Sequence, residues 1–206
     1  MKKILTATLS LVCFCTLSIS LHAEPEHASA SLTTSQQQAL ATEAKSHIKT
    51  LATALKSTLQ HGMKTAGPAA SVSLCQIQAP AITKATSKQV SDSSWSISRT
   101  SLQPRSLNNT PDAWVIQVMK DFEKRKVQGE DVSQISHSEI RNNQYYFIKA
   151  IPTQAACLAC HGKKLTKDVA ITLKQLYPND KATGFNIGDI RGVFIAKKQL
   201  IGAIHE

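Results

Sequence analysis

The chain has 206 residues, a formal net charge of +10 at pH 7 and five cysteines. This length is enough for one domain with a proper hydrophobic core, so the composition does not require a second domain. The basic balance favours an acidic partner or an anionic surface.

The first 23 residues have the pattern of a secretory signal peptide. Lys2 and Lys3 precede an uncharged apolar run from Ile4 to Leu21, and Ala23 completes a cleavage site. A retained membrane anchor fits less well, because threonines and serines interrupt the run. We expect residues 1–23 to be removed, residues 24–33 to form a mobile leader, and the protein to be periplasmic. Nucleic acid is therefore not an expected partner.

A long amphipathic helix is predicted next. Thr34 and Gln37 have the spacing of an N-terminal capping box, and Gly67-Pro68 is expected to end the helix. Between them apolar residues recur every three or four positions, as on the buried face of a helix. These residues are Leu40, Ala44, Ile48, Leu51, Leu55, Leu59 and Met63. A long helix of this kind is also compatible with a homodimer.

The region after this helix is predicted to be short and irregular. Residues 69–79 are small and apolar and contain Cys75, which we expect on a short helix or turn. Pro80 should stop that helix, because proline lacks the N–H group that a helix interior needs. Residues 83–94 are polar and are predicted to form a loop.

The middle of the chain alternates strand and helix patterns. Residues 95–98 alternate as a strand does, and residues 99–109 are typical of a loop. A helix is expected to begin with Pro111 at its first position and to end near Lys126. The strongest hairpin signal joins residues 138–141 to 144–151 through Asn142-Asn143, since asparagine tolerates the positive φ of a two-residue turn.

The C-terminal part predicts a helix over residues 168–176, a turn at 178–180, and a final strand over 192–196. The order of these elements indicates an α+β fold with a small antiparallel sheet, a long N-terminal helix and flanking helices. We treat residues 34–206 as a single domain.

The segment Cys157-Leu158-Ala159-Cys160-His161 has the spacing of a c-type haem site. Two residues between the cysteines allow one tight turn to present both thiols to the vinyl groups, and His161 then lies beneath the iron as a ligand. Half a zinc site would need further closely spaced ligands, and a redox dithiol would follow a strand in a thioredoxin-like unit. We therefore predict one covalently bound haem c.

The residues alone do not determine which group ligates the iron at its second axial position. Signal cleavage removes Cys13 and Cys15 and haem attachment uses two more thiols, so Cys75 is a free thiol, an intermolecular cross-link or a ligand. An exported protein keeps an unpaired thiol safely only when it is buried or bound, which modestly favours ligation. The other candidates are His47, His61, His137, His205, Met63, Met119 and no ligand at all.

Several segments, taken with the haem motif, resemble a bacterial family of single-haem c-type domains long catalogued as of unknown function. These segments are Cys75 with Ala79-Pro80, Ser98 to Leu102 with Arg105 and Asn109, Pro111 to Trp114, Tyr177 to Gly184, and Gly188 to Gly192. The resemblance implies a PAS-like antiparallel sheet with a long N-terminal helix, and axial ligation by His161 and Cys75. It also implies that an arginine faces a haem propionate. The residues implied to line the haem are Arg99, Arg105 and the segment from Tyr177 to Arg191.

A periplasmic monohaem cytochrome is the expected function. A Cys75 thiolate would stabilise ferric iron and lower the reduction potential, and its release on reduction would make a switch. We expect a sensor of redox state or of a diatomic gas, or a low-potential electron carrier, with an unidentified redox or signalling protein as partner. The alternative is a haem enzyme such as a peroxidase with an open distal site.

Overall fold

The computed structural model describes residues 32–91 and 94–200. The predicted signal peptide, most of the predicted leader and His205 lie outside these ranges. Within them, no helix is both long enough and apolar enough to cross a membrane. The elements are α1 (Thr34–Ser91), β1 (Trp95–Thr100), η1 (Leu107–Asn109), α2 (Ala113–Val127), β2 (Ser136–Arg141), β3 (Gln144–Pro152), η2 (Ala155–Cys157), α3 (Leu158–His161), α4 (Lys167–Leu176) and β4 (Ile190–Gln199).

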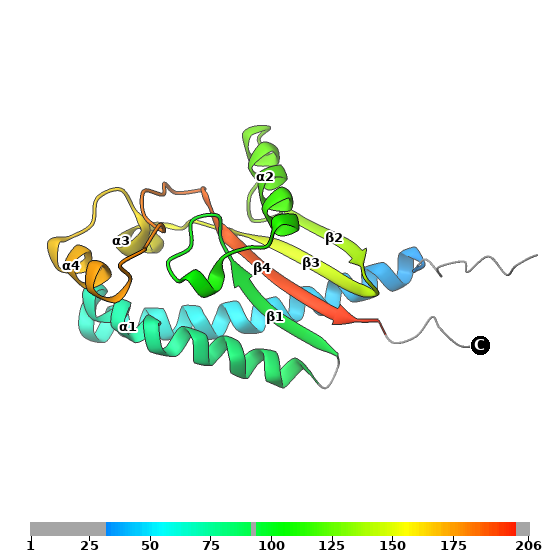
Figure 1. The fold of residues 1–206 in the computed structure, drawn as a ribbon, viewed down its shortest axis with the longest axis horizontal. Coiled ribbons are helices and arrows are strands. Elements are labelled where there is room, and N and C mark those ends of the chain that lie inside the picture. Colours follow the sequence, from blue (N-terminus) through cyan, green and yellow to red (C-terminus); the bar gives the residue numbers. More distant parts are fainter. Residues whose placement is uncertain (1–31, 92–93, 201–206) are drawn as a thin grey trace, which may run out of the picture. The chain divides into compact units, whose positions relative to one another are not determined.

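The four strands form one antiparallel sheet in the order β1-β4-β3-β2. The last strand therefore lies between β1 and β3, and its register places Phe194 opposite Arg99 on one side and Lys149 on the other. Figure 1 shows α1 along one side of this sheet and α2 on the other. The arrangement confirms the predicted α+β fold with a PAS-like sheet and a long N-terminal helix.

The hairpin between β2 and β3 turns through Asn142 and Asn143, as the sequence predicts. Both residues have positive φ, 48° and 57° respectively. Asparagine adopts this conformation at lower cost than most residues, and the paired φ values suit a two-residue turn between twisted strands.

The helix α1 consists of two arms that meet at Gly67, whose φ of 79° and ψ of 179° are not helical. The first arm ends at Gly67-Pro68, as predicted, and Figure 1 shows the second arm returning beside the first. They pack closely at Gly62, where an added Cβ would lie 2.7 Å from Leu74 Cδ2. The N-terminal capping box is one residue earlier than predicted: Thr33 and Gln36 exchange backbone–side-chain hydrogen bonds of 2.8 and 3.2 Å.

The prediction that Pro80 stops the second arm and that residues 83–94 form a loop is wrong. The helix continues to Ser91, although proline in a helix interior costs about 3 kcal/mol. The arm is held by side chains that recur with the helical period. Ala79, Thr86 and Val90 are buried, and Val90 and the partly buried Ile82 pack in the apolar cluster on the sheet.

The predicted start of α2 is also slightly wrong. Asp112 is the N-cap residue, and its carboxylate accepts a 2.8 Å hydrogen bond from the backbone N–H of Val115. Pro111 therefore precedes the cap and is not the first helical residue. Aspartate satisfies a free N–H group at the helix start, so the cap outweighs the preference of proline for the first turn.

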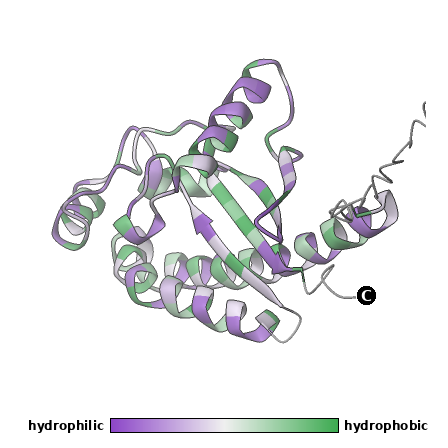
Figure 2. Cartoon of the chain, turned by 45° about the vertical axis from the view of Figure 1, so that its right-hand side comes forward, coloured by the Kyte–Doolittle hydropathy of each residue, from purple (hydrophilic) through white to green (hydrophobic). Residues whose placement is uncertain are grey.

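The two faces of the sheet carry separate apolar clusters, because alternate strand residues point to opposite faces. Trp95, Ile97 and Phe147 pack against α1, whereas Ile148 and Val193 pack against α2. Figure 2 shows the hydrophobic colour along the middle of the sheet. Arg99 continues the alternation of Trp95 and Ile97, so β1 presents it to the face covered by α1.

Candidate functional site

A cavity of about 1270 Å³ lies on the α1 side of the sheet. Its wall includes Leu55 and Ile97 of the cluster on the sheet, and Val72 and Cys160 of a third cluster formed with α4. The volume exceeds the usual range of small-molecule pockets, roughly 300–1000 Å³. All eight residues singled out from the sequence line this cavity: Cys75, Arg99, Arg105, Cys157, Cys160, His161, Tyr177 and Arg191.

The Cys-x-x-Cys-His segment is a compact turn made by η2 and α3. All three of the described cysteines are free thiols; Cys160 is buried, and Cys157 is half-buried. Gly162 ends α3, and an added Cβ there would lie 2.6 Å from the carbonyl oxygen of Leu158. A glycine is therefore required directly after the histidine for the turn to close this tightly.

His161 is held by the loop that follows α4. Its Nδ1 atom lies 2.6 Å from the carbonyl oxygen of Ala182, and its backbone carbonyl accepts a 3.0 Å hydrogen bond from Phe185 N–H. A carbonyl oxygen cannot donate, so Nδ1 carries the proton and Nε2 keeps its lone pair. Arg191 Nε, 3.2 Å from Nδ1, therefore cannot also donate to that atom. Burial and then the charge of Arg191 hold the pKa of His161 well below 6.5.

Arg105 joins the loop after β1 to the haem-motif segment. Its Nε lies 3.1 Å from Asp180 Oδ2, and its Nη2 donates to the carbonyl oxygens of Cys160 and Ala182. Its guanidinium also lies 5.9 Å from the centre of the Tyr177 ring. Arg105 is thus occupied by the protein itself and fixes the position of the segment that ends in His161.

Arg99 and Arg191 form no ion pair with a described carboxylate. Arg191 Nη1 donates to Ser101 Oγ at 3.1 Å and its guanidinium lies 5.3 Å from the Phe185 ring centre. Burial and the neighbouring arginines lower the pKa of Arg191 to about 10, and burial also lowers the pKa of Arg99. Two unpaired guanidinium groups in a cavity wall favour an anionic occupant.

The same excess of positive charge extends over the rest of the wall. Among the described residues, those that line the cavity include no aspartate or glutamate. The cationic lining residues are Lys56, Lys64, Lys84, Lys88, Arg99, Arg105 and Arg191.

The structure separates the candidates for the second axial ligand. Of the candidates that the structure describes, only Cys75 and Met63, on the second and first arms of α1, line the cavity. His47 packs against Trp95, with ring centres 5.5 Å apart. His61 is exposed, His137 contacts Glu139 on β2, and Met119 is buried between α2 and the sheet.

Cys75 is partly buried in the cavity wall. Burial raises the pKa of its thiol, and the charges of Arg99 and Arg105 act in the opposite direction. Cationic groups on the adjoining wall would therefore help to stabilise a thiolate at this position.

Sequence reasoning missed several residues that organise the site. Ser101 forms hydrogen bonds with both the side chain and the backbone carbonyl of Arg191, and Asp180 forms an ion pair with Arg105. Ser101 and Asp180 both lie in segments that carried the family resemblance, so a signal for each existed. No residue-type pattern points to the Ala182 carbonyl, because every residue has one.

The described residues do not provide the ligands that the alternative, a structural zinc site, would need. Within residues 32–91 and 94–200, no group of three or more His, Cys, Asp or Glu side chains is placed to hold a metal ion. A structural zinc site normally supplies four such ligands.

Comparisons with known proteins agree with this architecture. A family model described as Tll0287-like matches residues 26–197. Among solved structures, the cyanobacterial haem protein Tll0287 is similar, with a TM-score of 0.55 and 22% sequence identity. The match covers 85% of this chain and 99% of that one, and at this identity it shows a shared fold. No curated protein matches this chain significantly.

Proposed function

The chain belongs to the Tll0287-like family, and on this premise we propose that it is a periplasmic haem c protein that senses redox state or a diatomic gas, or carries single electrons at low potential. The observation that carries the proposal is the convergence of Cys157, Cys160, His161 and Cys75 on one cationic cavity. The expected export signal, in residues 1–23, supports the compartment.

The residues of the cavity fit a covalently attached haem. The Cys157 and Cys160 thiols would form the two thioether bonds, and His161 offers an unprotonated Nε2 because its Nδ1 proton is directed to Ala182. Cys75, which lines the same cavity from the second arm of α1, would supply the second axial ligand. When bound, the haem would supply one-electron chemistry at its iron.

Charge also supports this occupant. Haem carries two propionate carboxylates, and Arg99 and Arg191 are two cavity guanidinium groups without a described carboxylate partner. Arginine binds carboxylates through paired, charge-assisted hydrogen bonds. A neutral ligand would leave both charges uncompensated in a partly buried wall, which is costly.

Sensing would act through the second arm of α1. With haem bound, a Cys75 thiolate would compensate the charge of ferric iron, so we expect a low potential and a weaker hold on Cys75 after reduction. Release of Cys75 would free the arm that packs on the sheet through Ile82 and Val90. A redox or signalling protein would then read that movement.

The peroxidase alternative has less support. A peroxidase needs a positioned base on the distal side of the haem. Of the described histidines, only His161 lines the cavity.

The test is production of the exported protein in cells that attach haem to Cys-x-x-Cys-His sequences. Mass spectrometry should show one haem on the cleaved chain, and the substitutions Cys157→Ala and Cys160→Ala should each remove one thioether bond. Carbon monoxide binding to the ferrous protein would support the sensor, whereas six-coordinate iron in both states would support the carrier. A chain without covalent haem would overturn the proposal.

A further inference from the structure

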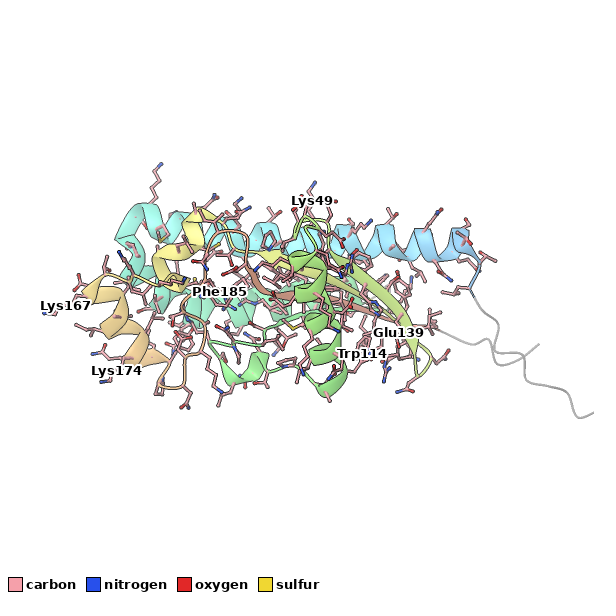
Figure 3. The ribbon with its side chains drawn as sticks, turned by 90° about the horizontal axis from the view of Figure 1, so that it is seen from above. Lys49, Trp114, Glu139, Lys167, Lys174 and Phe185 are labelled. Atoms are coloured by element: carbon pink, nitrogen blue, oxygen red, sulfur yellow. The ribbon has the colours of Figure 1, made fainter. Side chains whose placement is uncertain are left out.

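The outer face of α4 carries two lysines on either side of an exposed apolar residue. Lys167, Ile171 and Lys174 are spaced by four and three residues, which places them on one helix face. Ile171 is 45% exposed, and both lysines are exposed. Figure 3 shows Lys167 and Lys174 on the outer side of this helix.

Two more exposed lysines, Lys163 and Lys164, lie between α3 and α4. None of these four lysines forms an ion pair with a described residue. The only acidic residue on α4 is Asp168. We call the set Lys163, Lys164, Lys167, Ile171 and Lys174 the lysine face.

The inner face of the same helix packs against the haem motif. Val169 and Leu173 are almost fully buried and form an apolar cluster with Cys160 and with Val72 of α1. Lys167 and Lys174 therefore lie about one helix diameter, roughly 10 Å, from a cysteine of the motif. Charge on this face is close to the predicted haem without lining its cavity.

We propose that the lysine face docks an acidic protein that exchanges electrons with the haem. An exposed apolar centre with a charged rim is the usual composition of a protein interface, and unpaired lysines select and steer an acidic partner. One electron would leave ferrous haem, which becomes ferric, and would reduce the partner by one electron. The proposal rests on the proposed function and specifies the partner's chemistry.

The first experiment uses the haem-loaded protein and ferricyanide, a one-electron oxidant with three negative charges. Stopped-flow absorption would follow oxidation of the ferrous protein, which yields ferric protein and ferrocyanide. The variant Lys167→Glu/Lys174→Glu should lower the second-order rate constant about tenfold at low salt, and the difference should shrink at high salt. The matched control, Lys49→Glu/Lys120→Glu, has the same net charge but exposed positions on α1 and α2.

The second measurement tests binding without electron transfer. Titration calorimetry with poly-L-glutamate should give binding to the wild type and the control but not to the lysine-face variant. The variant Lys163→Gln/Lys164→Gln, outside the helices, provides a second test because a charge reversal in the last turn of α4 could weaken that helix. It should lower poly-L-glutamate affinity severalfold.

Three results would decide against the docking face. Equal ferricyanide rates for Lys167→Glu/Lys174→Glu and Lys49→Glu/Lys120→Glu would overturn the proposal. Poly-L-glutamate binding by Lys167→Glu/Lys174→Glu that matches the wild type would also overturn it. If the Lys167→Glu/Lys174→Glu variant lost binding to phosphatidylglycerol vesicles while its ferricyanide rate and poly-L-glutamate binding stayed unchanged, the lysines would be assigned to a lipid surface. A preparation without covalent haem would instead refute the proposed function, so the two failures are distinguishable.

Discussion

Arg105 and Asp180 form an ion pair of 3.1 Å whose side chains are only 13% and 10% exposed. The pair joins the loop after β1 to the turn after α4, two segments far apart in the sequence. Because the same guanidinium also bonds the carbonyl oxygen of Cys160, it supports the haem motif from outside the motif's own turn.

Replacement of Arg105 by leucine should lower the free energy of unfolding by about 3 kcal/mol, since it leaves a nearly buried carboxylate unpaired. Urea unfolding followed by circular dichroism would measure the change. The matched control is Arg141→Leu, because Arg141 pairs with Glu139 at 42% and 34% exposure. Exposed pairs contribute about 0–1 kcal/mol, so equal losses for the two variants would contradict the assigned role of Arg105.

Glu43 should make stability depend on pH below its ordinary pKa of 4.5. Hydrogen bonds from Lys198 Nζ at 3.0 Å and Trp95 Nε1 at 2.8 Å lower the pKa of this carboxylate, and His47 also favours its charged form. A lowered pKa in the folded state stabilises the protein above the unfolded value. That contribution is lost as pH falls through the folded pKa.

Glu43→Gln removes this contribution. The difference in melting temperature between wild type and variant should stay constant above about pH 5 and shrink as the pH falls below 4.5. Calorimetric melting from neutral pH to pH 3 would show it. A difference that persists unchanged to pH 3 would be inconsistent with a lowered pKa for Glu43.

Gly192 should not tolerate a side chain. A Cβ at this position would lie 2.5 Å from the backbone carbonyl of Thr100, so Gly192→Ala must push β1 away from β4. We expect a loss of about 3 kcal/mol in urea unfolding and a disturbed Ser101–Arg191 contact.

The control for this substitution is Gly129→Ala, where φ is +93° but nothing lies within 4 Å of the added atom. Strain alone should cost about 1 kcal/mol there. The haem absorption spectrum should change for the first variant only. Identical spectra and equal stabilities would show that the approach of β1 to Gly192 does not matter.

Arg99 should raise the reduction potential of the bound haem, because a nearby positive charge favours the reduced form. Replacing it by glutamine removes one charge from the cavity wall, and at about 10 Å this corresponds to a decrease on the order of 50–100 mV. Potentiometric titration would measure the decrease, with Arg141→Gln on β2 as a remote control. An unchanged or higher potential in Arg99→Gln would place Arg99 away from the iron.

The parts of the fold that depend on local chemistry could be predicted. The Asn142-Asn143 turn needs only residues that accept positive φ, and Gly67-Pro68 marks the end of a regular apolar repeat. The second arm of α1 could not be predicted to its full length, because Pro80 opposes a helix locally. Only packing against the sheet, which local sequence does not show, offsets its cost.

The candidate site divides in the same way. Cys157, Cys160 and His161 are adjacent in sequence, so their spacing alone indicates a haem motif. Cys75 lies on α1 and Arg191 on β4, and the packing that places both in one cavity wall is not evident from spacing. The family resemblance, not spacing, pointed to them.

The most direct test of the account is the electron paramagnetic resonance spectrum of the oxidised, haem-loaded protein beside Cys75→Ser and Met63→Leu. These two positions are the described ligand candidates in the cavity, so each substitution controls for the other. We predict a low-spin ferric signal of thiolate type that is lost in Cys75→Ser and retained in Met63→Leu. A spectrum without thiolate character, unchanged by Cys75→Ser, would contradict ligation by His161 and Cys75.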